Sequence, residues 1–294
     1  MSTPDDQARS DNTYMIDPES GIEMARLMYQ DKLITQIMGG LLEDIPRASQ
    51  PRRILDVACG PGAWALEVAF NYPKVEVVGF DLSNLMIQYA NAQAKAQRLS
   101  NVRFVVMDAR KPLEFPDGWF DIVNARFISR FMRKEDWPGL VGDLVRITRL
   151  GGVIRFTDCD DAGITTSPAL EKLQTLGLRA AYLAGMAFYP NPEARSYGIT
   201  PVLGLFLHNA GCRNIQEKTH ILNYSTGSEA HTNQYENWKM AAKLAQPFLL
   251  KMKVSTQEEL NALYEQMLVE MMQNDFRALM YIVSVWGEKP STSI

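Results

Sequence analysis

Three aspartates, each near the end of an apolar run, are the residues of this chain best suited to act together on one ligand. Asp56 lies near the end of the first run, and Asp81 and Asp108 close the next two. After the first aspartate, Gly60 and Gly62 allow a sharp turn and leave no side chain between the main chain and a ligand. A strand that enters a small-residue loop in this way is typical of a binding site for a nucleotide-like cofactor.

Two classes of cofactor use such a loop. Counted from Gly60 to Ala65, the pattern Gly-x-Gly-x-x-Ala matches the dinucleotide fingerprint with its last glycine replaced, and Asp81 follows Gly60 by 21 residues, near the expected spacing of about 20. Counted from Asp56, the pattern is Asp-x-Ala-x-Gly-x-Gly, in which an acid precedes the turn and can hold a cationic group. The missing third glycine and the position of Asp108 favour the second interpretation. A nicotinamide-dependent oxidoreductase remains an alternative.

The ordered set of three acids resembles the S-adenosylmethionine-dependent methyltransferases with a Rossmann-like fold, in their small-molecule group, over about residues 50–160. In that family the first acid and its loop face the methionine part of the cofactor, the second binds both ribose hydroxyls, and the third faces the adenine amino group. The resemblance carries these roles to Asp56, Asp81 and Asp108. One departure is Ala58, where the family usually has its first glycine, and we expect its methyl group to tighten the turn without closing it.

The resemblance therefore implies S-adenosylmethionine as the cofactor. Ser83 is placed to cap the following helix, and Met86 either touches adenine or packs in the core, with the first interpretation favoured. An N-terminal helix that contains Arg26 resembles the helix that closes over the cofactor, and the equal alternative is that it only packs on the sheet. The implied cofactor-binding residues are Asp56, Ala58, Gly60, Gly62, Asp81, Leu82, Met86, Asp108, Ala109, Asn124 and Arg26.

Alternating strand-like and helix-like segments predict a parallel sheet with helices on both faces. The expected strands are 52–57, 75–80, 102–107, 120–125, 152–158, 214–222 and 280–287. The expected helices of the core are 62–71, 83–97 and 136–148, the last ending at the pair Gly151-Gly152. The fold class expected from the resemblance is α/β: a Rossmann-like, seven-stranded, mostly parallel sheet whose last strand is antiparallel, with helical cap insertions.

Four segments follow from this assignment. Residues 1–50 are expected to form a helical lid with a helix over 19–38, and residues 51–160 the cofactor-binding core. Residues 161–210 read as an apolar cap segment. Residues 211–294 complete the sheet with two strands and carry a helical insertion over about 226–277, in which Ser255-Thr256-Gln257-Glu258 is a candidate helix start. The insertions are rich in methionine and aromatic residues, which favours a roofed pocket for a small apolar or aromatic molecule.

Catalysis requires a nucleophile aligned with the cofactor's methyl group, and an oxygen or nitrogen nucleophile can also require a base. His208 and His231 fall in the added segments and are weak candidates for that base, as is Tyr14 near the expected lid helix. His220 lies in an expected strand and reads as structural. Related sequences often have a His-Leu pair after the fourth strand, where this chain has Phe131-Met132, so the resemblance does not carry a base to that position.

Composition limits the partners. The 294-residue chain has a net charge of −4, which argues against a nucleic-acid substrate. A basic group at Arg126, Arg130, Arg133 and Lys134 is read as a solvated helix end. The three cysteines are widely spaced, which suits reduced thiols and shows no metal-ligand pattern. Without an apolar run of 18 residues or a signal peptide, a cytoplasmic location with no membrane contact is expected.

The sequence thus predicts a methyltransferase acting on a small, largely apolar molecule at oxygen, nitrogen or carbon. An alternative is a protein of the same fold that binds the cofactor without methylating, as another enzyme or as a binding module. The sequence also leaves open a homodimer in which the N-terminal helix closes the pocket of a neighbour.

Overall fold

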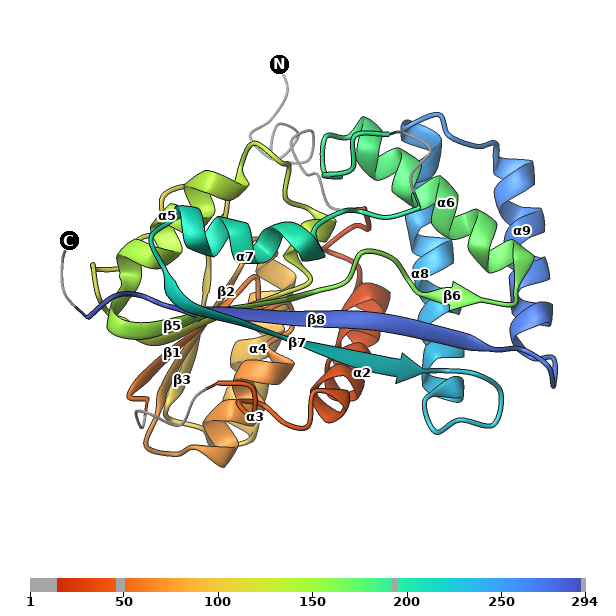
Figure 1. Cartoon of the computed structure of the whole chain (residues 1–294). Helices are drawn as coiled ribbons and strands as arrows, with labels where there is room; N and C mark the ends of the chain where they lie inside the picture. The colour runs from red at the N-terminus through yellow and green to blue at the C-terminus, as the bar shows by residue number, and fades with distance from the viewer. Residues whose placement is uncertain (1–14, 46–50, 192–194, 292–294) are drawn as a thin grey trace, which may run out of the picture.

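The computed structural model describes residues 15–45, 51–191 and 195–291. A single mixed sheet runs through the middle of this described part, with helices on both of its faces (Figure 1). Its eight strands are β1 (Arg53–Val57), β2 (Glu76–Asp81), β3 (Val102–Val106), β4 (Phe120–Arg126), β5 (Thr148–Asp158), β6 (Ile164–Thr165), β7 (Arg213–Asn223) and β8 (Ala278–Glu288).

The strand order is β3-β2-β1-β4-β5-β8-β6, with β7 paired along the other edge of β8. The first five strands are parallel, and β8 is antiparallel to β5, β6 and β7. The expected Rossmann-like fold with an antiparallel last strand is confirmed. The structure adds β6, a strand of two residues that pairs with the start of β8 and is too short to leave a pattern in the sequence.

Alternating side chains of the inner strands build a separate core on each face of the sheet. In β1, Ile54 belongs to the core that contains Trp64, whereas Leu55 belongs to the core that contains Trp137. The first core lies under α3 (Ala63–Asn71) and α4 (Asn84–Ala96), and the second lies under α5 (Trp137–Ile147) and α7 (Thr200–Asn209), as Figure 1 shows. Strands covered on both faces are apolar at nearly every position, which explains the continuous apolar runs of the sequence.

A group of helices stands beyond the end of the sheet at which β1 to β5 finish (Figure 1). It consists of α2 (Gly21–Ile37), α6 (Pro168–Leu183), α8 (His231–Lys251) and α9 (Gln257–Met271). These helices pack on one another and share a third core that includes Ile34, Leu170, Leu249 and Met267. None of the described helices is both long enough and apolar enough to cross a membrane.

The predicted helix starts are confirmed by their caps. The expected helix over 19–38 is α2, and the hydroxyl of Ser20 accepts from the amide of Glu23 at its start. Ser83 caps α4 by accepting from the amide of Met86 at 3.2 Å. Thr256 caps α9 in the same way.

One boundary prediction is wrong. Helix α5 ends at Ile147, and the pair Gly151-Gly152 lies inside β5 instead of capping the helix. Phe120 pairs with Thr148 while Ile122 pairs with Val153, so β5 carries a bulge at this point. A side chain at Gly152 would place its Cβ 2.9 Å from the carbonyl oxygen of Asp121. The glycine therefore permits a close approach of two strands.

The segment 161–210 divides into two parts with different surroundings. Helix α6 belongs to the helical group beyond the sheet, whereas α7 covers a face of the sheet beside α5. Phe206 of α7 stacks on Trp137, with ring centroids 5.3 Å apart and planes 7° apart. Some of the apolar residues that suggested a cap over 161–210 therefore belong to the core that contains Trp137.

Candidate active site

One large cavity opens where the strands β1 to β5 end, and it encloses about 360 Å³. The loops after these five strands form its floor, and residues of α2, α6 and α8 form its roof. In open α/β sheets ligands bind outside the carboxyl ends of the strands, and this cavity has that position.

The glycine turn after β1 is in left-handed backbone at three alternate residues. The φ angles are 51° at Ala58, 53° at Gly60 and 77° at Gly62. A Cβ at Gly62 would lie 2.6 Å from the ring of Phe104, so only glycine fits there. Alanine in this region costs about 1–2 kcal/mol. The methyl group of Ala58 leaves the turn open, as expected, but its backbone is strained.

Asp81 lies at the cavity wall with both carboxylate oxygens oriented by the backbone. One oxygen accepts from the amide of Gly60 and the other from the amide of Ser83, each at 2.9 Å. Burial raises the pKa of Asp81, and these hydrogen bonds oppose the rise. Since a carboxylate has about four acceptor positions, Asp81 keeps the capacity to accept a hydrogen bond from a ligand hydroxyl. Leu82 and Met86 line the cavity beside it.

Asp108 is bound on its own loop by the guanidinium of Arg110. Nε and Nη2 of Arg110 each donate to the carboxylate at 2.9 Å. Burial raises the pKa of Asp108, but the hydrogen bonds and charge of Arg110 outweigh it and leave the pKa below its usual value. Asp108, Ala109 and Arg110 all line the cavity.

Asp56 is held from behind by a row of polar side chains across three strands. The register aligns Asp56 of β1 with Asn124 of β4 and Asn124 with Arg155 of β5. Asn124 donates from Nδ2 to Asp56 at 2.8 Å and accepts from Nε of Arg155 at 2.9 Å. Burial raises the pKa of Asp56 to about 7, with Asn124 and Arg155 opposing the rise.

Asn124 differs from its expected role as a cofactor contact. It is fully buried and does not line the cavity, whereas Asp56 does. The reason is the parallel register of β1 and β4, which places the amide beneath the carboxyl group. Asn124 therefore orients Asp56 and does not itself reach the cavity.

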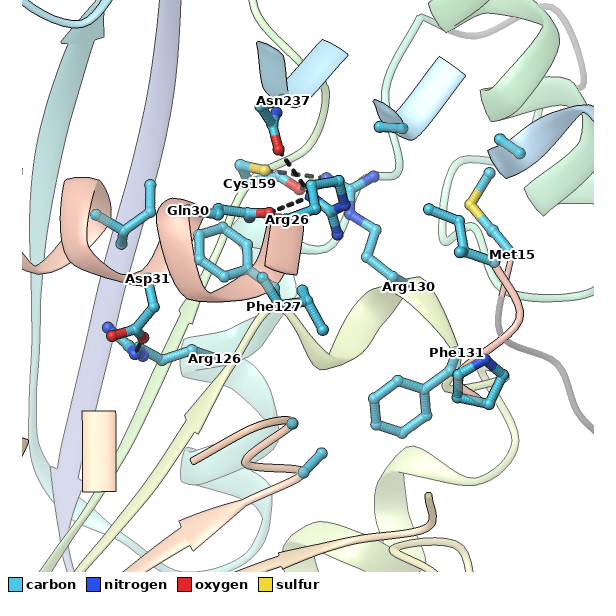
Figure 2. A pocket seen from close by; sticks show the side chains of 18 of the residues that line it. Met15, Arg26, Gln30, Asp31, Arg126, Phe127, Arg130, Phe131, Cys159 and Asn237 are labelled. Atoms are coloured by element: carbon cyan, nitrogen blue, oxygen red, sulfur yellow. Dashed lines mark hydrogen bonds and ion pairs between the residues drawn. The ribbon is translucent and has the colours of Figure 1, made fainter. Parts of the chain in front are cut away.

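Arg26 of α2 lines the cavity and connects two helices of its roof. Its guanidinium pairs with Glu23 at 2.6 Å and donates to Asn237 of α8 at 2.8 Å. Figure 2 shows Gln30 and Asn237 directed toward it. Arg26 thus lies at the wall, as the lid hypothesis requires, and is held there by partners within the protein.

Two arginines that were expected at a solvated helix end, Arg126 and Arg130, instead line the cavity. Arg126 ends β4 and pairs with Asp31 of α2, and Arg130 ends the short helix η1 (Ile128–Arg130) (Figure 2). Burial lowers the pKa of Arg126 to about 9, and the charge of Arg155 adds to this effect. Arg133 and Lys134 do not line the cavity. A run of basic residues has no periodic pattern in the sequence, so it does not show that Arg126 and Arg130 face a cavity while Arg133 and Lys134 do not.

The structure does not bring the candidate histidines to the site. His208 is exposed near the end of α7, and Nε2 of His231, at the start of α8, lies 2.8 Å from the carbonyl oxygen of Met271. His220 is buried beside Ser284. Among residues 15–45, 51–191 and 195–291, no histidine lines the cavity. Tyr14 lies outside the described residues.

A carboxyl group that the sequence analysis did not single out lies on the β5 side of the cavity. Asp161 lines the wall and accepts from the amide of Gly163 at 2.8 Å. Burial raises its pKa, against the effect of that hydrogen bond. Burial likewise raises the pKa of the Cys159 thiol to about 12, which leaves that thiol un-ionised. In the described part of the chain no cluster of His, Cys, Asp and Glu is arranged to hold a metal ion.

Comparison with known proteins identifies the segment that carries the loops after β1 to β4. Residues 54–152 match a family model described as a methyltransferase domain. A demethylmenaquinone methyltransferase of Thermus thermophilus is 39% identical over 109 residues, which are 37% of this chain and 48% of that protein. A malonyl-[acyl-carrier protein] O-methyltransferase of Legionella pneumophila is 35% identical over 111 residues, 36% of each protein. The matched segment thus covers less than half of either relative.

The fold extends further than the sequence similarity. A phosphoethanolamine N-methyltransferase 2 of Haemonchus contortus, solved in complex with S-adenosyl-L-methionine, superposes with a TM-score of 0.55 at 17% identity, over 92% of this chain and 57% of that one. The shared arrangement therefore includes the sheet that continues beyond residue 152.

Proposed function

We propose that this chain, in which residues 54–152 match a methyltransferase-domain model, is an S-adenosylmethionine-dependent methyltransferase acting on a small, largely apolar molecule. The observation that carries the proposal is one cavity that combines the glycine turn, Asp56, Asp81 and Asp108 with an apolar chamber under α6 and α8. The two curated relatives are named for demethylmenaquinone and for malonyl-[acyl-carrier protein], which supports an organic acceptor over a nucleic acid.

We assign the cofactor to the half of the cavity over β1, β2 and β3. When bound, its sulfonium supplies an electrophilic methyl group. Asp81 accepts from the ribose hydroxyls, since its carboxylate lies at the cavity wall and is oriented by the backbone amides of Gly60 and Ser83. Asp108, with Met86 and Ala109, borders the adenine, and Asp56 faces the cationic methionine end. The family match favours this cofactor over the nicotinamide alternative.

The apolar chamber is assigned to the methyl acceptor. Its wall beyond the cofactor half includes Phe127, Phe131, Leu173, Leu178 and Met280. Such a wall excludes water and holds an apolar acceptor against the methyl group. Alignment of this kind contributes on the order of 7–11 kcal/mol to lowering a barrier. In this proposal α2 acts as the lid, residues 51–160 as the cofactor-binding core, and α6 and α8 as the roof; residues 1–14 and 46–50 of the expected lid segment lie outside the described residues.

Calorimetric titration with S-adenosylmethionine tests the cofactor assignment. In Asp81→Ala the loss of two charge-assisted hydrogen bonds should weaken binding by about 100-fold or more. The matched control is Asp275→Ala, which removes an exposed carboxylate outside the cavity. Equal affinity in the wild type and Asp81→Ala would remove the assignment.

Formation of S-adenosylhomocysteine with a panel of apolar quinols, phenols and amines then tests methyl transfer. Tight cofactor binding with no turnover of any acceptor would instead favour the non-methylating alternative.

A further inference from the structure

Four arginines line the cavity, and one of them lacks a carboxylate partner. The ion pairs of the other three are Arg26 with Glu23, Arg110 with Asp108, and Arg126 with Asp31. Within the described ranges, no Asp or Glu oxygen lies within 4.0 Å of the guanidinium of Arg130. Arg130 is thus a cation at the wall of an apolar chamber without a direct counter-charge.

The guanidinium of Arg130 is oriented by Cys159 and Tyr197. Its Nη2 donates to the carbonyl oxygen of Cys159 at 3.0 Å and contacts Sγ of the same residue at 2.9 Å, as Figure 2 shows. The ring of Tyr197 lies 4.3 Å from the guanidinium carbon. The contacts with Cys159 and Tyr197 hold the guanidinium of Arg130 in place, but neither contact neutralises its positive charge.

The remaining donors of Arg130 are accessible from the cavity. Apart from Cys159 and the hydroxyl of Tyr197, no described residue accepts a hydrogen bond from Arg130, and its Nε and Nη1 are not fully enclosed. Nη1 of Arg155, in contrast, is enclosed without a partner. Because arginine remains protonated in proteins, the wall at Arg130 presents a fixed cation with unused donors.

The nearest carboxyl groups are occupied by other donors. Asp158 accepts from the amide and hydroxyl of Ser129 and from the amide of Cys159. Asp161 accepts from the amide of Gly163. Their charges act on Arg130 at longer range, without an ion pair. A desolvated cation is costly unless it is paired, so an anionic group from a ligand would lower the free energy of this site.

Arg130 lies on the acceptor side of the cavity. It follows β4 and rests on Cys159 after β5, whereas Asp81 and Asp108 end β2 and follow β3. In the sheet, β4 and β5 lie on the other side of β1 from β2 and β3. Arg130 and the proposed ribose and adenine positions therefore lie on opposite sides of β1.

We propose that Arg130 binds a carboxylate of the methyl acceptor, so that the substrate is an apolar molecule carrying one acid group. The planar guanidinium has donors in the geometry that a carboxylate accepts. The apolar body then lies against Phe127, Phe131 and the residues of α6 that line the chamber. This inference rests on the proposed function, because it places the acceptor beside a bound cofactor.

The test uses full-length protein saturated with S-adenosylhomocysteine and a matched pair of probes, decanoate and decanamide, in calorimetric titration at neutral pH. The two probes share a chain length and differ in charge. The wild type should bind decanoate at least about 10-fold more tightly than decanamide, the scale of one charge-assisted contact. In Arg130→Gln this preference should fall below about 3-fold.

Two further variants make the result specific. Arg133→Gln removes the same charge three residues later, at a half-exposed side chain outside the cavity, and should keep the preference. Arg130→Lys retains the charge but loses the planar fork, and should keep part of it. It also replaces Arg130→Gln if that variant does not fold.

Four results would overturn the inference: equal affinity for the two probes in the wild type, no binding of either, a preference that survives in Arg130→Gln, or a loss of S-adenosylhomocysteine affinity in that variant. The last would show that Arg130 holds the cofactor's own carboxylate. Failure of the wild type to bind S-adenosylhomocysteine would instead contradict the proposed function.

Discussion

The amide of Asn124 lies directly behind Asp56, 2.8 Å from its carboxylate oxygen and out of contact with the cavity. Two residues 68 positions apart are thus joined because β1 and β4 are parallel neighbours in register. The bond stabilises the ionised form of a carboxyl group whose pKa burial raises to about 7. The protonation of Asp56 therefore depends on its partner in β4.

Cofactor affinity should consequently rise with pH through the titration of Asp56. A cationic ligand prefers the ionised carboxylate, which predominates above the pKa of about 7. Replacing Asn124 by Leu removes the opposing hydrogen bond, so the pKa of Asp56 and the midpoint of the affinity curve should both move to higher pH. Calorimetric titration with S-adenosylmethionine between about pH 6 and pH 9 measures both curves. Superimposable curves would show that Asn124 does not control this group.

The stability of the fold should decrease in acid through Asp44. Its carboxylate accepts from Nζ of Lys218 at 2.8 Å and lies 3.4 Å from Nε2 of His220. Burial raises the pKa of Asp44, but the hydrogen bonds of His220 and Lys218 outweigh it and lower the pKa to about 2. A carboxyl group with a lowered pKa stabilises the folded state above its unfolded pKa, and this contribution is lost as pH falls from about 4 to about 2.

Asp44→Asn removes that contribution. At pH 7 the free energy of unfolding should fall by about 1–3 kcal/mol, and between pH 4 and pH 2 the variant should lose less stability than the wild type. Urea denaturation at several pH values measures both effects. Asp275→Asn, at an exposed side chain, is the control. Parallel pH profiles for wild type and Asp44→Asn would contradict the prediction.

Ala58→Gly should stabilise the protein. The left-handed backbone at Ala58 costs an alanine about 1–2 kcal/mol, whereas glycine makes the unfolded chain more flexible at a cost of about 0.4–1 kcal/mol. The net gain is expected to be about 0.5 kcal/mol, read as a higher urea midpoint.

Gly62→Ala is the matched opposite change. It adds a methyl group at a φ of 77° and 2.6 Å from the ring of Phe104, so it should lower the midpoint strongly. A loss of stability in Ala58→Gly would show that the methyl group makes a packing contribution larger than its backbone strain.

Local patterns were sufficient to predict the glycine turn and the three acids that line the cavity. Each of these features occupies only a few consecutive residues: the apolar runs, the glycine turn, and the acids Asp56, Asp81 and Asp108. Strands, tight loops and helix caps form from residues that are close together in the sequence. The caps at Ser83 and Thr256 were predictable for the same reason. The antiparallel last strand came from the family resemblance, since no local pattern states a strand's partner.

Tertiary structure alone decided the rest. Asn124 moved from a cofactor contact to a support because strand register, a long-range property, sets which side chains meet. Arg126 and Arg130 became cavity residues because α2 and α6 cover the end of β4, which a charge run does not reveal. His208 and His231 do not reach the cavity, because α7 lies on a face of the sheet and the ring of His231, at the start of α8, lies against the carbonyl oxygen of Met271. A sequence specifies the residue types that can do chemistry, but packing between distant segments determines which of them share a cavity.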